Sequence, residues 1–226
     1  MVPAIIQQGF FVEFLVGGKG EYRHYFCGPN QIRGAHCPNC AKPLLQFLIL
    51  DTHDPRLNLT RVPSPTISLL YCWTCNIAGE GFFYQLIADG VKLLKYGRGG
   101  LDNFFNKDNF PRHFPGAPAR LIPLTTEEQR AICSLNADEI DYPERDELAQ
   151  ALAVPMHQVG GEPYLVQHDW ECTSLTCPVC HREMSFLASI GDDAVLPRGF
   201  VENDFVQVLY SYCSLCHVVG AIHTCD

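Results

Sequence analysis

Four Cys-x-x-Cys pairs contain eight of the twelve cysteines in this 226-residue chain. Two pairs lie in each half, and their cysteines are Cys37, Cys40, Cys72, Cys75, Cys177, Cys180, Cys213 and Cys216. A Cys-x-x-Cys turn presents two sulfur atoms from one tight loop, and a structural zinc ion is usually held by four such ligands in a tetrahedron. The pairing therefore predicts two structural zinc ions, one in each half of the chain.

Other chemistry is possible at these pairs. The second half twice contains Cys-x-x-Cys-His, the pattern of covalent haem attachment, through His181 and His217. Ala41 and Asn76 stand at these positions in the first half, so a haem interpretation fits only half of the pattern. A thioredoxin-like redox pair is disfavoured because each pair has a partner pair. Iron held by four cysteines stays open, because iron sites also contain Cys-Pro-x-Cys.

A second candidate site surrounds a Gly-Gly pair in the second half. Its candidate ligand groove consists of His157, Gly160, Gly161, Pro163 and Gln167. His157, His168 and Glu171 could exchange protons in an acid–base reaction there. Such side chains are more often hydrogen-bonding groups of turns or of the surface. We therefore assign no catalytic residue and keep an enzyme as the alternative function.

The remaining cysteines have no counterpart in the other half of the chain. They are Cys27, Cys133, Cys172 and Cys225. Isolated cysteines mostly pack as small apolar side chains. We expect these four to do so.

The two halves of the chain repeat the same order of motifs. Val16-Gly17-Gly18 corresponds to Val159-Gly160-Gly161, and Leu45-Gln46-Phe47-Leu48 corresponds to Met184-Ser185-Phe186-Leu187. The two Cys-x-x-Cys pairs are separated by 31 residues in the first half and by 32 in the second. A motif order that recurs at a fixed period indicates a duplicated structural unit.

Short apolar or alternating runs bounded by turn residues predict β-strands. They are Phe10–Val16, Leu44–Leu50, Thr66–Cys72, Met184–Ile190 and Phe205–Tyr212. Asp89-Gly90 between two apolar runs predicts a hairpin with a type I′ turn over residues 82–96. Thr125 and Glu128 form the pattern of a capping box, which predicts the start of a helix.

The stretch Gly97–Pro123 is rich in Gly, Pro, Asn and Arg and is expected to lack regular structure. A second short helix is expected over Pro143–Leu152. The predicted division is a first β-rich zinc-knuckle repeat over 1–96, a linker over 97–123, and a helical lead-in with the second repeat over 124–226. The expected fold class is α+β and β-rich, with two pseudo-repeated antiparallel-sheet lobes that each carry a four-cysteine, zinc-ribbon-like site. The sequence leaves open whether the lobes share one sheet.

Composition and charge exclude several classes of protein. Hydrophobic residues make up 47% of the chain, which is enough for a core, and the formal net charge is −9. That charge argues against binding along nucleic-acid phosphates, which requires clustered Lys and Arg. The chain lacks the basic start of a secretory signal, and no apolar run reaches the roughly 18 residues of a membrane span. A cytoplasmic, reducing location is expected, where paired cysteines are metal ligands more often than disulfides.

Several segments resemble a known family. They are His157–Gln167 and Met184–Asp192 in the second half, and Lys42–Asp51 and Phe83–Gly90 in the first. Their Gly-Gly-x-Pro and Leu-Gln-Phe-Leu patterns resemble the YwqG-like domains of unknown function. With Cys-x-x-Cys knuckles added, the chain is similar to the related domain of programmed cell death protein two.

The resemblance implies a duplicated β-rich α+β fold, zinc in members that carry the cysteines, and a binding role as a chaperone or an immunity protein. It implies no catalytic residue. Two features depart from the pattern: Gly20 stands where the family has proline, and YwqG-like domains without knuckles lack the cysteines.

The expected function is that of an intracellular, zinc-stabilised, non-catalytic module that binds a protein or peptide. Its acidity favours a basic partner. An enzyme with an acid–base groove near Gly160-Gly161 and an iron–thiolate redox protein are the alternatives.

Overall fold

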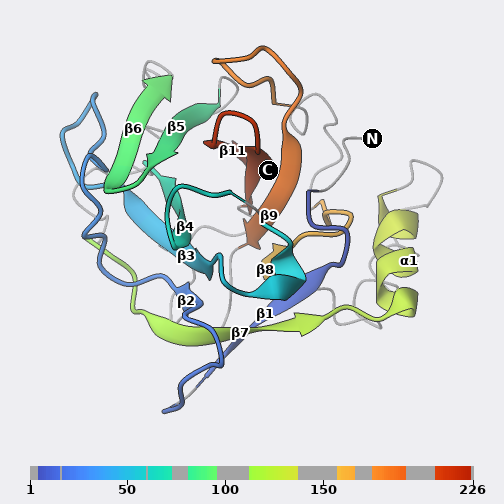
Figure 1. Cartoon of the computed structure of the whole chain (residues 1–226). Coiled ribbons are helices and arrows are strands. Elements are labelled where there is room, and N and C mark those ends of the chain that lie inside the picture. The colour runs from blue at the N-terminus through green and yellow to red at the C-terminus, as the bar shows by residue number, and fades with distance from the viewer. Residues whose placement is uncertain are drawn as a thin grey trace.

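The computed structural model of the chain describes residues 5–15, 17–59, 61–72, 81–95, 112–136, 157–165, 175–191 and 207–224. Within these ranges, eleven strands form one antiparallel sheet that curls around a core, and one α-helix lies beside it (Figure 1). The strands are β1 Phe10–Phe14, β2 Tyr25–Phe26, β3 Leu45–Asp51, β4 Thr66–Tyr71, β5 Phe82–Ile87, β6 Gly90–Lys95, β7 Ala117–Pro123, β8 His157–Val159, β9 Ser185–Gly191, β10 Gln207–Cys213 and β11 Val218–Thr224. The helix is α1, Thr126–Leu135, and a 3-10 turn spans Pro55–Leu57.

The halves of the chain share this sheet. Its strand order is β4-β3-β2-β7-β1-β8-β9-β10-β11-β5-β6. Strands of the predicted first repeat, 1–96, therefore pair with strands of the predicted second repeat, 124–226, at β1–β8 and at β11–β5. This answers the question that the sequence left open, because the described strands belong to one sheet and not to two.

The predicted strands and the hairpin are confirmed. β1, β3, β4, β9 and β10 each begin and end within two residues of the expected bounds wherever these are described. β5 and β6 pair down to Ile87 and Gly90, so the turn consists of Ala88 and Asp89. A type I′ turn needs a positive φ at both central residues, and neither Ala88 nor Asp89 has one. The hairpin prediction was right and its turn type was wrong.

The expectation of an irregular linker over 97–123 was wrong in its last part. Residues 117–123 form β7, which pairs with β1 from Ala119 to Pro123 and with β2 at Ala117 and Pro118. Proline lacks only the N–H, and the carbonyl of Pro118 still accepts a hydrogen bond from Leu15 N at 2.9 Å. A second proline, Pro123, is the last residue of β7, where the missing N–H of proline has little effect on the hydrogen bonds of the sheet. β2, β8 and β11 were not expected as strands.

The capping box at the start of α1 is confirmed. Glu128 N donates to Thr125 Oγ1 at 3.2 Å, and the Glu128 carboxylate accepts from Thr125 N at 2.6 Å. Ile132 and Leu135 are the buried residues of the helix. The helix expected over Pro143–Leu152 lies outside the described residues. No helix in the described ranges is long and apolar enough to cross a bilayer.

The core has two parts. The curled sheet encloses the larger one, which includes Phe47, Tyr84 and Tyr210. A smaller cluster, with Phe186 and Leu209 among its members, packs around the cysteines of the second half. Successive side chains of a strand point to opposite faces. Neighbouring side chains of β10 therefore pack in different parts of the core, and all seven residues of the strand are buried.

The two hairpins that carry the cysteines have the same register. Leu45 pairs with Tyr71 in β3–β4, and Ser185 pairs with Tyr212 in β9–β10. In both hairpins, the pairing register shifts at a bulge two residues further along the strand. Phe47 is the bulged residue of β3, and Leu187 is the bulged residue of β9. Position 45 therefore corresponds to 185. The sequence match of Leu45 with Met184 was wrong by one residue.

Candidate metal centres

The four cysteines of the second half converge. The loop before β9 carries Cys177 and Cys180. Cys213 is the last residue of β10, and Cys216 lies in the turn between β10 and β11. The four sulfur atoms all lie within 4.8 Å of one another. Residues far apart in sequence meet here because β9 and β10 are antiparallel neighbours.

The sulfur spacing fits a tetrahedral metal site. The Sγ atoms of Cys180 and Cys213 are 3.7 Å apart. A tetrahedral ion with ligands at about 2.3 Å places two thiolates about 3.8 Å apart. Disulfide-bonded sulfurs are separated by only about 2.05 Å. The four cysteines are therefore not joined as disulfides, and their sulfurs have the spacing that a shared cation requires.

Three cysteines of the first half are arranged in the same way. Cys37, Cys40 and Cys72 also have sulfur atoms within 4.8 Å of one another. The Cys40 and Cys72 sulfurs are 3.7 Å apart, as in the second half. The predicted fourth ligand, Cys75, lies outside the described residues. The described part therefore supplies three convergent donors.

Matching backbone hydrogen bonds build the two loops that precede β3 and β9. Cys37 N donates to Lys42 O at 2.8 Å, and Cys177 N donates to Arg182 O at 2.8 Å. The residue after the second cysteine donates back to the first, Ala41 to Cys37 O and His181 to Cys177 O. These tight turns hold both sulfurs of a loop on one side.

The histidines of the haem-like pattern have a backbone explanation. His181 and His217 adopt positive φ angles of 57° and 55°, and Ala41, at the position corresponding to His181, has 57°. Histidine is among the residues enriched in this left-handed conformation. The four sulfurs also point to one common position, whereas haem attachment requires two sulfurs that each bind a separate haem carbon. The geometry therefore favours a metal ion held by the sulfurs.

The electrostatics of the second cluster are compatible with a bound cation. The backbone N–H of Arg182 lowers the pKa of Cys180 to about 7. Burial raises the pKa of Cys213 and, aided by the neighbouring thiols, raises that of Cys216 to about 12. Four thiolates so close together repel one another, and a divalent ion removes that penalty because it binds the deprotonated form.

Four cysteine ligands are typical of a structural metal site. The second cluster has four cysteine donors, and the groups that could hold a metal ion in the described residues contain no carboxylate or imidazole. Four protein ligands fill a tetrahedral shell and leave no position for water or substrate. Such an ion would tie β9, β10 and β11 together at one end of the sheet.

The candidate groove around Gly160 and Gly161 is closely packed. Both glycines are buried and have positive φ angles, of 66° and 67°. A Cβ at Gly160 would lie 2.6 Å from the Ile6 side chain, and one at Gly161 would lie 2.8 Å from Gly9 Cα. The glycine pair therefore serves the contact between β8 and the N-terminal segment.

The other groove residues make structural contacts where they are described. The His157 ring packs 4.7 Å from the Phe26 ring and is 4% exposed. The carbonyl of Pro163 accepts from the Asn136 side chain at 2.6 Å. Gln167, together with His168 and Glu171, lies outside the described residues. A ligand groove there stays a prediction.

The isolated cysteines differ from one another. Cys27 is fully buried, and burial raises the pKa of its thiol far above the ordinary value. It packs as expected. Cys133 on α1 is exposed, which contradicts the expectation. Cys172 and Cys225 lie outside the described residues.

The sequence interpretation missed one buried polar group. His24, Asp54 and Arg56 form a hydrogen-bonded network beside a cavity between β7 and the loop before β2. The sequence signal for part of this network was Asp54-Pro55, the pattern of a helix cap followed by proline at the first helical position. In the structure, the Asp54 side chain caps the 3-10 turn and accepts a hydrogen bond from Arg56 N at 3.0 Å.

Comparison of the chain with protein-family models, with curated proteins and with solved structures returned no match in any of the three. The resemblance to YwqG-like domains therefore stays a prediction, and the function has to be argued from the cysteine geometry.

Proposed function

We propose that this chain is a zinc-stabilised, non-catalytic module that binds a protein or peptide in a reducing compartment such as the cytoplasm. The observation that carries the proposal is the convergence of Cys177, Cys180, Cys213 and Cys216 at tetrahedral spacing with all four donors from the chain. A closed thiolate shell stabilises a fold and offers no vacant position for a reaction.

The first half would hold a second ion of the same kind. Its loop has the hydrogen bonds, the positive φ and the 3.7 Å sulfur distance of the second half. Cys75 would complete that shell. This likeness supports a duplicated origin, in which each repeat contributes one knuckle-bearing hairpin to the common sheet.

Zinc would supply folding free energy. Structural zinc sites in small units contribute on the order of 10 kcal/mol at neutral pH. The second centre joins the loop before β9 to the β10–β11 turn, and both segments border the smaller core cluster, which contains Cys177 and Cys213. Removing the ion would loosen this end of the sheet first.

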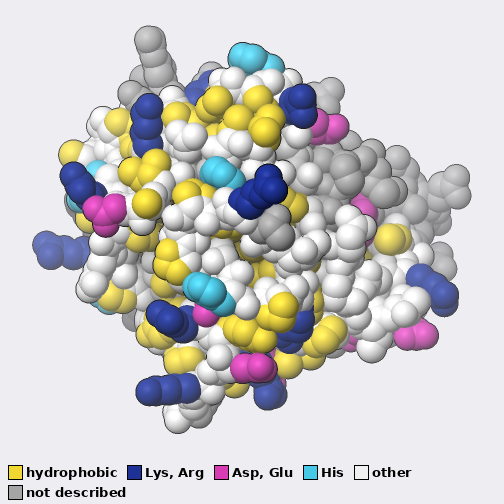
Figure 2. Space-filling view, viewed as in Figure 1, with side chains coloured by type: hydrophobic (Ala, Val, Ile, Leu, Met, Phe, Trp, Pro, Cys, Tyr) yellow, Lys and Arg dark blue, Asp and Glu magenta, His cyan; other side chains and the backbone are white. Residues whose placement is uncertain are grey.

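The protein-binding role is supported by apolar side chains at the tips of the knuckles. Val179 is 48% exposed and Leu215 is 62% exposed, and each lies between two cysteines of the second centre. A metal-braced loop holds such side chains in place for a partner to cover them, at little cost in ordering. Figure 2 shows hydrophobic side chains grouped on the surface at this upper end of the view.

The partner is proposed to be basic because the negative charge is concentrated in the sequence. Six of the ten residues from 138 to 147 are Asp or Glu. A dense cluster of negative charges attracts a cationic partner and makes the association sensitive to salt.

The first experiment measures metal content. Elemental analysis of the purified chain should find about two equivalents of zinc, and the protein should be colourless. Coloured protein containing iron would instead support the iron–thiolate alternative. Less than one equivalent of either metal would overturn the structural-metal proposal.

The second experiment tests binding. The tagged chain is used to capture partners at low and high salt, alongside the variant Val179→Ser/Leu215→Ser. Ile87→Ser is the comparison variant, because Ile87 is exposed to a similar degree, 41%, and lies on β5 outside both cysteine loops. The same basic protein should be captured by the parent chain and by Ile87→Ser, less by the double variant, and less at high salt. Equal capture by all three chains with full zinc content would contradict the proposed surface.

A further inference from the structure

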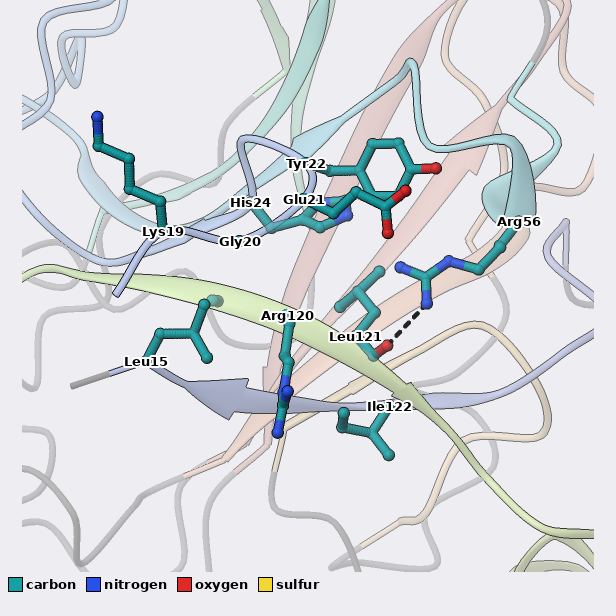
Figure 3. A pocket seen from close by; sticks show the side chains of 11 residues that line it. Leu15, Lys19, Gly20, Glu21, Tyr22, His24, Arg56, Arg120, Leu121 and Ile122 are labelled. Carbon is teal, nitrogen blue, oxygen red and sulfur yellow. Dashed lines mark hydrogen bonds between the residues drawn. The ribbon is translucent and has the colours of Figure 1, made fainter. Parts of the chain in front are cut away.

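A cavity of about 290 Å³ lies at a gap in the sheet, away from the cysteines. β2 is only two residues long and pairs with β7 at Ala117 and Pro118. Beyond these pairs, Ala119 N still donates to His24 O at 3.0 Å, and then the chain before β2 turns away. The cavity occupies the space next to Arg120, Leu121 and Ile122 of β7 (Figure 3).

Arg56 bridges the gap. Its guanidinium enters from the 3-10 turn, and Nη1 donates to the carbonyl of Leu121 at 3.0 Å (Figure 3). The guanidinium carbon lies 5.4 Å from the centre of the Phe10 ring and 5.5 Å from that of Tyr22. On this edge of β7, the Arg56 side chain thus supplies a hydrogen bond that a longer β2 would otherwise supply.

A buried network holds Arg56 in this position. Nε and Nη2 donate to the Asp54 carboxylate at 2.9 Å and 2.6 Å. The Asp54 side chain is fully buried and lies 3.0 Å from His24 Nε2. Because Asp51 N donates to His24 Nδ1 at 3.1 Å, the proton of His24 sits on Nε2 and is donated to Asp54. His24, Asp54 and Arg56 therefore form one rigid unit with the guanidinium at its outer end.

The guanidinium keeps unused donors. It has five N–H groups. Acceptors among the described residues take three of them, which leaves one N–H on Nη1 and one on Nη2. The Arg56 side chain is 38% exposed and lines the cavity. Hydrogen bonds to Asp54 raise the pKa of Arg56, so the group stays charged.

The lining of the cavity contains basic and apolar side chains. Lys19, Arg56 and Arg120 line it together with one acidic residue, Glu21. Arg56 is paired with Asp54 and Arg120 with Glu13, so Lys19 is the lining cation for which the described residues show no ion pair. Figure 2 shows basic and acidic side chains side by side at the lower end of the view, where Figure 1 has β7. The apolar part of the wall consists of Leu15, Leu121 and Ile122.

We propose that this cavity binds a carboxylate group that carries a small apolar side chain, with Arg56 as the principal donor and Lys19 as the second cation. The remaining N–H groups of a held guanidinium can donate to the oxygens of a carboxylate. The volume suits a single amino-acid residue, so the ligand is the C-terminal residue of a peptide or a free carboxylic acid of similar size. The proposal goes beyond the metal centres and does not depend on them.

The test uses the full chain, labelled with ¹⁵N. The probes are a hexapeptide ending in leucine with a free carboxylate, the same peptide with a C-terminal amide, and N-acetyl-leucine. Titration with the free-acid peptide should shift the amide signals of Tyr22, Leu121 and Ile122 and reach saturation. The amidated peptide should bind about tenfold or more weakly, because it lacks the charged acceptor.

The small acid distinguishes the two sources of the carboxylate. Binding of N-acetyl-leucine as tightly as the peptide means that the site recognises a free acid. Tighter binding of the peptide identifies a chain terminus. Equal affinity for the acid and the amide, or no saturable shift with either acid at millimolar concentration, overturns the proposal.

The variants separate binding from folding. Lys19→Glu changes an exposed cavity residue and should weaken binding of the free acid several-fold, whereas Lys92→Glu on β6 makes the same charge change elsewhere and should have no effect. Arg56→Lys keeps the charge and loses the paired donors, so it should also bind more weakly. Zinc content and the amide spectrum report whether each variant is folded. Identical affinities for Lys19→Glu and Lys92→Glu would contradict the proposed cation.

Discussion

The hydroxyl of Tyr84 on β5 accepts a hydrogen bond from Leu70 N on β4 at 3.0 Å, and it thus links β4, at one end of the curled sheet, to the last strand but one at the other end. The same hydroxyl donates to Ser68 O at 2.7 Å. β4 and β5 are not neighbours in the strand order, so this contact crosses the seam where the sheet does not close. Tyr84 is fully buried. One side chain thus satisfies two backbone groups at a strand edge.

Tyr84→Phe should destabilise the fold by about 1–3 kcal/mol, because it leaves a buried N–H and a buried carbonyl without the hydroxyl. The measurement is urea unfolding of the zinc-loaded protein. Tyr25→Phe removes a hydroxyl from a partly exposed tyrosine on β2 and should cost less than about 0.5 kcal/mol. A cost for Tyr84→Phe no greater than for Tyr25→Phe would show that the seam does not need this contact.

The sequence predicted the local features that depend on neighbouring residues. Alternating apolar runs identified β1 and β9, and Thr125 with Glu128 marked the start of α1. The spacing of the cysteine pairs also predicted the convergence of sulfurs, because antiparallel strands between the pairs bring both ends together. These signals are physical consequences of side-chain period and turn geometry.

The rest depended on contacts that span the whole chain. β7 was missed because its two prolines looked like loop residues, although only the neighbouring β1 and β2 decide that its carbonyls are paired. The insertion of β5–β6 beside β11 follows from no local pattern. His24, Asp54 and Arg56 are brought together by the same long-range packing, and no spacing rule connects them.

Cys213→Ser should remove one of the two proposed zinc ions and destabilise the smaller core cluster by several kcal/mol, because three remaining thiolates cannot close the shell. Elemental analysis and thermal unfolding measure the two effects. Cys133→Ser is the matched control, since Cys133 is exposed on α1 and lies outside both clusters. Full zinc content in Cys213→Ser would rule out the proposed second centre.

Stability should depend on pH through His223, because burial lowers the pKa of its ring to about 4. Above about pH 6.5, the folded and unfolded chains are both neutral at this position, so its effect on stability is absent. As the pH falls from about 6.5 to 4, the unfolded chain takes up a proton that the folded chain does not, and stability falls by about 3 kcal/mol. Unfolding free energies of the parent chain and of His223→Leu, measured at fixed free zinc, should differ in slope only in this window. Parallel pH profiles for the two proteins would contradict the assignment.

Gly160 and Gly17 occupy matching places in the two predicted repeats of the sequence but have different surroundings, and alanine substitution should have different effects at the two positions. Both have positive φ, 66° and 73°, so alanine strains each backbone by about 1–2 kcal/mol. At Gly160 the new Cβ would also lie 2.7 Å from Gln8 O and 2.6 Å from the Ile6 side chain, whereas nothing lies within 4 Å at Gly17. Overpacking adds about 1–3 kcal/mol, so Gly160→Ala should lose clearly more unfolding free energy than Gly17→Ala. Equal losses would mean that the N-terminal segment moves away freely, and that the space beside Gly160 is open to a ligand after all.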